Sequence, residues 1–140
     1  MNSILADEYT LFTKTLNYHW NVTGPRFYSI HEFLENHYRS LLEVIDDVAE
    51  RIREVEGVPI GTLKDFKKKS SIVESANKMP DASGMISDLM SDHQLLQTEI
   101  TSLLEYIKKC KKPDPGSEDF FGRLVKMHEE MSWKLKSHLN

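Results

Sequence analysis

The sequence contains one cysteine, Cys110, among its 140 residues. A single cysteine cannot form an internal disulfide, and it also excludes a zinc site built from several thiolates. The amino-terminal segment has no basic run followed by a long apolar stretch, and no uninterrupted apolar segment approaches the ~18 residues of a membrane helix. We therefore expect a cytosolic protein in a reducing compartment, without a membrane segment.

Glycine and proline are also scarce, with 6 and 5 residues respectively, and no segment alternates convincingly like a β-strand. Apolar residues instead recur at spacings of three and four, which predicts an all-α protein. The length is that of a single domain covering residues 1–140, large enough to bury a core without disulfides. The formal net charge of −4 disfavours nucleic-acid binding by the molecule as a whole, although lysines cluster at 67–69 and 108–112.

Four long helices are predicted from the apolar periodicity and the helix-end signals. Gly24 and Pro25 should stop the first helix, and Ser29 with Glu32 forms an S-x-x-E capping box for the second. Ser117 should cap the fourth helix. The expected ranges are about 3–21, about 29–56, about 82–110 and from 117 onward.

The connection over residues 57–81 is much longer than the other two, and Thr62 should start one short helix within it. The second helix, of about 28 residues, would be about 40 Å long. A connection of this length can run back along the bundle. The sequence therefore predicts a ferritin-like four-helix bundle with one long crossover that contains a short extra helix.

The second predicted helix carries two pairs of possible metal ligands at i, i+4 spacing: His31 with Glu35, and Asp46 with Glu50. At 100° per residue, all four lie on a face distinct from the apolar stripe that includes Leu34 and Leu41. Leu42 and Ala49 share the ligand face, which indicates that it is buried against another surface. The alternative for either pair alone is solvated charge.

Glu35 and Asp46 are about 16 Å apart along the helix, too far to bind one ion together. However, 31 and 50 sum to 81, as do 35 and 46. If two copies of this helix pack antiparallel about a two-fold axis near residues 40 and 41, His31 meets Glu50 of the second copy and Glu35 meets its Asp46. Such a dimer would create two identical sites.

His19, near the end of the first helix, could enter the same site beside His31. Two histidines with three carboxylates suit iron, with manganese and zinc as alternatives. The set contains no thiolate that would favour copper or an iron–sulfur cluster. The chain contains no Glu-x-x-His motif. That motif supplies ligands to the di-iron centre inside many four-helix bundles, so an intrasubunit centre of that type is not expected.

These residues resemble those of the Dps family, small dodecameric ferritin-like proteins that oxidise and store iron. The resemblance spans nearly the whole chain and rests on five segments: "NYHWNVTGPRF", "HEFLE", "DDVAERI", "TLKDF" and "HEEMSWKLKSHL". It implies a ferroxidase centre formed by His19, His31 and Glu35 of one subunit with Asp46 and Glu50 of its two-fold mate. Many members have Asp at the position of Glu35.

The resemblance further implies that Fe(II) is oxidised, preferably by hydrogen peroxide, and that ferric mineral is stored inside a hollow homododecamer in the cytoplasm. Two further groups of acidic residues have family counterparts, each with solvated charge or helix capping as the alternative. The candidate mineral-nucleating carboxylates are Glu32, Glu43 and Asp47, and the candidate pore aspartates are Asp114 and Asp119.

The remaining histidines, His37, His93, His128 and His138, have no acidic partner at a convergent spacing, and we interpret them as structural or surface residues. Two other functions stay open. Some Dps proteins condense DNA, associating with the nucleoid through basic terminal tails, but neither end of this sequence is rich in lysine. Alternatively, the charged face could form salt bridges in a helical interaction protein.

Overall fold

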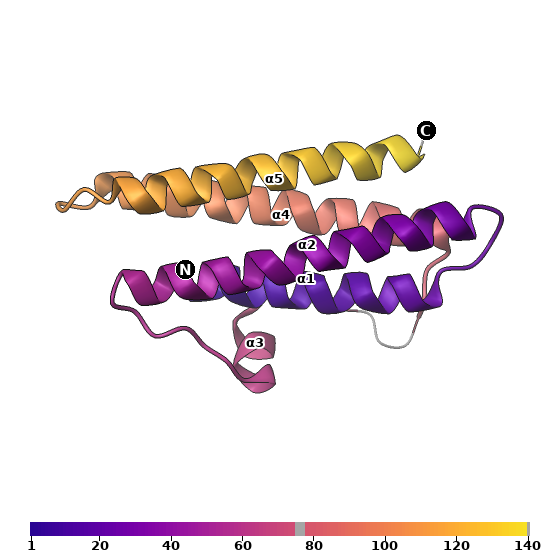
Figure 1. Cartoon of the computed structure of the whole chain (residues 1–140), viewed down its shortest axis with the longest axis horizontal. Helices are drawn as coiled ribbons and strands as arrows, with labels where there is room; N and C mark the ends of the chain where they lie inside the picture. Colours follow the sequence, from indigo (N-terminus) through magenta and orange to yellow (C-terminus); the bar gives the residue numbers. More distant parts are fainter. Residues whose placement is uncertain (75–77, 140) are drawn as a thin grey trace.

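A computed structural model of the protein describes residues 1–74 and 78–139. Four long helices pack as a bundle, with α1 beside α2 and α4 beside α5, while the short α3 lies on the outside (Figure 1). The described residues contain no strand, and the predicted all-α fold is confirmed. The helices are α1 (Asn2–Asn21), α2 (Phe27–Glu54), α3 (Leu63–Lys69), α4 (Ala82–Lys109) and α5 (Pro115–Leu139).

The predicted crossover is present: the chain leaves α2, forms α3 against α1, and crosses to α4 (Figure 1). Tyr9 of α1 stacks on Phe66 of α3 with ring centroids 4.2 Å apart. The Asp7 carboxylate accepts hydrogen bonds from the Ser70 hydroxyl and the Ser71 amide at 2.7 and 2.6 Å. Lys14 donates to the Val73 carbonyl at 3.1 Å. These contacts anchor the crossover to α1; part of the predicted link, residues 75–77, lies outside the described residues.

Two predicted helix starts are wrong. α2 begins at Phe27, and the Ser29 hydroxyl donates to the Arg26 carbonyl instead of capping an amide. Gly24, with φ of +111°, turns the chain tightly enough for the helix to start earlier. In α5, it is Asp114 that caps the helix, accepting from the Ser117 amide at 3.0 Å. The Thr62 cap of α3 is confirmed.

The buried face of α2 follows the predicted apolar stripe. The fully buried side chains include Ile30, Leu34, Leu41 and Val48. On the opposite arc, Leu42 is 54% exposed although it is a large apolar residue. Within residues 1–74 and 78–139, no helix is long and apolar enough to span a membrane.

A buried polar layer, composed of Glu8, His37, His93 and His128, crosses the centre of the bundle with one side chain from each long helix. Glu8 Oε1 lies 2.7 Å from His128 Nε2, His128 Nδ1 lies 2.8 Å from His93 Nδ1, and His93 Nε2 lies 2.8 Å from His37 Nε2. The expectation that His128 lacks an acidic partner is therefore wrong, because Glu8 is distant only in sequence.

The hydrogen bonds of this polar layer have one direction when Glu8 is ionised and His128 is neutral. Burial lowers the pKa of His37 to about 3 and holds that of His93 well below its ordinary value, so both rings are neutral. An ionised Glu8 only accepts, so His128 donates to it, His93 donates to His128, and His37 donates to His93. The two atoms left without partners are Glu8 Oε2 and His37 Nδ1. The layer is a structural device that ties together all four helices.

Candidate metal centre

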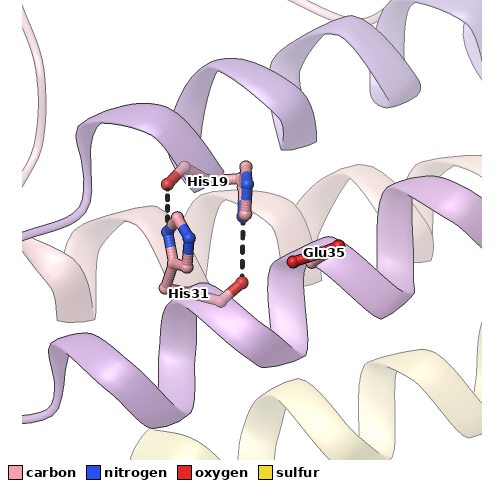
Figure 2. Close-up of side chains that lie close together, drawn as sticks. All are labelled: His19, His31 and Glu35. Carbon is pink, nitrogen blue, oxygen red and sulfur yellow. Dashed lines mark hydrogen bonds between the residues drawn. The ribbon is translucent and has the colours of Figure 1, made fainter.

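The turn between α1 and α2 brings His19 and His31 together. His19 lies in the last turn of α1, and His31 lies in the second turn of α2. The two imidazole rings stack with centroids 3.8 Å apart and an interplanar angle of 22° (Figure 2). The predicted proximity of these two histidines is thus present within a single chain.

Each histidine is hydrogen-bonded to the backbone of the other. His19 Nδ1 lies 2.9 Å from the His31 carbonyl oxygen, and His31 Nδ1 lies 2.8 Å from the His19 carbonyl oxygen (Figure 2). A carbonyl only accepts, so each Nδ1 carries a proton and donates. In the neutral rings both Nε2 atoms therefore keep a free lone pair, which is the form that binds a metal.

Glu35 follows His31 by one helical turn and completes a group of three possible ligands. One ligand atom from each of His19, His31 and Glu35 lies within 4.8 Å of the other two (Figure 2). His19 is buried, whereas His31 and Glu35 are partly exposed. Two neutral imidazoles and one carboxylate with open positions form a donor set typical of non-haem Fe(II). The residues present therefore fit iron.

Aromatic side chains pack around the two histidines. The Tyr38 ring lies edge-on to His19 with centroids 5.3 Å apart, and Phe27 lies 4.9 Å from His31. These contacts limit rotation of the two imidazole rings. Trp20, next to His19 in the last turn of α1, is 67% exposed.

Asp46 and Glu50 do not join this group within one chain. Both are exposed on α2. The helical rise over the intervening residues places them too far from Glu35 to bind one ion together with it. Leu42, Ile45, Asp46 and Ala49 together line a shallow hollow in the surface. The described chain thus presents three of the five predicted ligands as one cluster, Asp46 in the apolar-lined hollow and Glu50 exposed one helical turn further on.

The other predicted acidic residues fall into two groups. Glu32, Glu43 and Asp47 are exposed along α2. Asp114 pairs with Arg51 at 2.9 Å as well as capping α5, and hydrogen bonds from Ser117 lower its pKa. Asp119 pairs with Arg123 at 3.1 Å. Both pore candidates therefore have a cationic partner in the single chain.

Comparison with known proteins places the chain in a defined family. The family model described as a ferritin-like domain matches residues 1–140, and the chain belongs to this family. The chain is 34% identical over 140 residues to DNA protection during starvation protein 2 of Bacillus anthracis, covering 100% of this chain and 94% of the relative.

Within the ferritin-like proteins, the chain belongs to the Dps family. It superimposes on the crystal structure of Dps from Staphylococcus aureus with a TM-score of 0.92 at 31% identity, covering 99% of this chain and 91% of the other. It is also similar to Dps from Vibrio cholerae, described as a member of a broad superfamily of ferritin-like diiron-carboxylate proteins. Here the TM-score is 0.92 at 25% identity, with 99% and 86% of the two chains covered. The predicted resemblance and the ferritin-like fold are confirmed.

Proposed function

We propose that the protein is a ferroxidase and iron store that oxidises Fe(II), preferentially with hydrogen peroxide, at centres shared between two subunits. The observation that carries this proposal is the cluster of His19, His31 and Glu35, in which both imidazoles are fixed with Nε2 free. The diiron-carboxylate description of the related Vibrio cholerae protein supports iron as the substrate.

The exposed face of α2 supports completion of the centre by a second copy of the chain. An antiparallel pair of α2 helices centred between residues 40 and 41 would place Asp46 and Glu50 of one subunit beside Glu35 and His31 of the other. It would also cover Leu42, which is 54% exposed, and the neighbouring Ile45 and Ala49. Apolar burial then drives formation of the same interface that completes the ligand set.

Each residue has a distinct part in this chemistry. His19 and His31 provide neutral nitrogen donors, whereas Glu35, Asp46 and Glu50 provide negative charge that favours Fe(III) over Fe(II). Two Fe(II) ions held together can each give one electron to peroxide, whose O–O bond breaks. The overall reaction is 2 Fe²⁺ + H₂O₂ + 2 H₂O → 2 FeOOH + 4 H⁺. Because both electrons pass to one peroxide, hydroxyl radical is not released.

The storage part of the proposal concerns the assembled protein in the cytoplasm. Each subunit would be one domain, and twelve would enclose a cavity for ferric mineral. Glu32, Glu43 and Asp47, exposed on α2, are the proposed nucleating carboxylates. Asp114 and Asp119 are the proposed pore residues, and their arginine partners would have to release them to admit Fe(II).

The deciding experiment is anaerobic addition of Fe(II) followed by peroxide, with ferric species followed by ultraviolet absorbance. The double variant His31→Ala/Glu50→Ala should lose oxidation, while His138→Ala, which removes a histidine outside the centre, should match the native chain. Oxidation at native rate by the double variant would exclude the proposed centre. Size-exclusion chromatography of all three proteins establishes that assembly is unchanged.

The alternative function is binding of DNA, and the name of the Bacillus anthracis relative, a DNA protection protein, favours testing it. Lys67, Lys68 and Lys69 are exposed on α3 and could contact phosphates. Gel retardation at low salt tests this function. No shift at excess protein would exclude it, whereas a shift that Lys67→Glu/Lys68→Glu abolishes would establish it.

A further inference from the structure

The three clustered ligands of the metal centre are not held in the same way. His19 and His31 are fixed by each other's backbone carbonyls. Glu35 has no such bond to the backbone among the described contacts; its partner is a side chain, Arg39, whose Nη2 donates to Glu35 Oε1. Glu35 is also the only anionic member of the cluster. The charge of this half of the centre is therefore controlled by one ion pair.

Arg39 lies one helical turn after Glu35 and directly follows Tyr38, which belongs to the aromatic wall of the site. The pKa of its guanidinium is raised by Tyr38 and by the Glu35 carboxylate. Tyr38 in turn packs edge-on against the His19 ring. Arg39 is thus paired directly with a ligand of the site.

We propose that Arg39 sets the metal affinity of the centre by occupying the Glu35 carboxylate until a divalent cation displaces it. This inference rests on the proposed function. With Arg39 in place, the half-centre of two neutral imidazoles, one carboxylate and one guanidinium carries no net charge. A dication must therefore compete with a cation already present, and must bind beside its positive charge.

The inference predicts the sign of the effect. Arg39 is a positioning residue that holds Glu35 near the histidines and weakens metal binding at the same time. Removing its charge should leave the half-centre with a net charge of −1 and increase the affinity for divalent cations. The gain should pass through Glu35, and it should be smaller at high salt because the side chains of Arg39 and Glu35 are 66% and 37% exposed.

The test measures binding of Co(II) by calorimetric titration of the assembled protein at low and high salt. This measurement does not require peroxide. Arg39→Gln is expected to bind Co(II) about three- to tenfold more tightly than the native chain at low salt. Arg39→Lys keeps the charge and should stay within about twofold of native. Lys134→Gln, which breaks the comparable Glu130–Lys134 pair on α5, is the matched control and should leave Co(II) affinity unchanged.

A double-variant cycle identifies the route of the effect. In a Glu35→Gln background, Arg39→Gln should no longer increase Co(II) affinity. The inference is overturned if Arg39→Gln binds Co(II) as the native chain does or more weakly, or if its gain persists without Glu35. Titration of His31→Ala separates this failure from failure of the proposed function: undiminished Co(II) binding by that variant would exclude the centre itself.

Discussion

His19 and His31 fix one another through their backbones: the Nδ1–H of each ring donates to the carbonyl oxygen of the other residue, at 2.9 and 2.8 Å. Each histidine is thereby both a donor to and an acceptor for the other. The end of α1 and the start of α2 are joined by the same two bonds that select the metal-binding tautomer. The local fold and the readiness of the site for metal are therefore inseparable in this protein.

Sharing of the centre between subunits predicts a specific pattern of complementation. His31→Ala and Glu50→Ala should each abolish peroxide-driven Fe(II) oxidation when assembled alone. In a mixed dimer, one centre would carry both defects and the other would carry neither, so half of the native activity should return. Co-refolding the two variants in equal amounts, with half of the dimers mixed, should give about a quarter of native activity. Recovery of no activity would contradict a shared centre.

The exposed apolar face of α2 predicts that Leu42→Asp prevents pairing of subunits. A carboxylate at this position would be placed against the partner surface and would lose its hydration. We expect dissociation to smaller species in analytical ultracentrifugation together with loss of Fe(II) oxidation. Circular dichroism should show unchanged helicity, because Leu42 contributes little to the core of its own chain. Retention of both assembly and activity would exclude the proposed two-fold interface.

Glu99, on α4, should contribute stability that falls as pH rises towards neutrality. Burial, followed by a hydrogen bond to Asp7, raises the pKa of Glu99 to about 7 from 4.5. The folded protein therefore holds a proton that the unfolded chain has lost between these pH values, so the contribution of Glu99 to stability declines across that interval. His37 and His93, buried and neutral, act in the opposite direction below pH 6.5. The difference in thermal stability between the native chain and Glu99→Gln from pH 4.5 to 8 therefore measures the contribution of Glu99.

Replacing Glu99 by Gln should remove the fall in stability between pH 6.5 and 7, above the range in which the histidines act. Asp92, whose pKa is raised to about 6 mainly by burial, keeps a smaller decline that ends near that pH. Asp92→Asn is therefore the matched control, since it should remove only the lower part. A profile for Glu99→Gln that still falls between pH 6 and 7 would contradict the assignment.

The buried polar layer predicts a large loss of stability on removing His128. The side chains of His128 and Glu8 are both 0% exposed, so His128→Ala would leave a buried carboxylate without its donor. We expect a loss of about 3–5 kcal/mol in the free energy of unfolding, measured by urea denaturation at fixed protein concentration. Adding Glu8→Gln should restore part of it, because the neutral amide costs less to bury. A loss below about 1 kcal/mol in His128→Ala would contradict this role.

The polar layer also shows what sequence reasoning could have found. His37 lies three residues after Leu34 and four before Leu41, so the apolar stripe of α2 already passes through it. That position predicts a buried histidine. Its partners could not be predicted, because Glu8, His93 and His128 come from three other helices and their contacts depend on how the helices are rotated in the bundle.

The failed helix caps have a similarly local cause. Ser29 and Glu32 have the spacing of a capping box, but the left-handed Gly24 begins the turn early enough for α2 to start at Phe27. Ser117 was predicted as the cap of α5, whereas Asp114 reaches its amide and Arg51 at once. Both serines fit the sequence pattern of a helix cap. The backbone conformation of Gly24 decided the first case, and the ion pair between Asp114 and Arg51 decided the second.

The sequence by itself determined the four long helices, the long crossover and the family, because apolar periodicity and ligand spacing are properties of the chain. It also placed His19, His31 and Glu35 as candidate ligands on converging helix ends. Only the tertiary structure decided that the two histidines fix each other's tautomer, that Arg39 holds Glu35, and that a fully buried layer crosses the bundle. These relationships depend on distances of a few ångströms between separate helices, which a linear spacing does not specify.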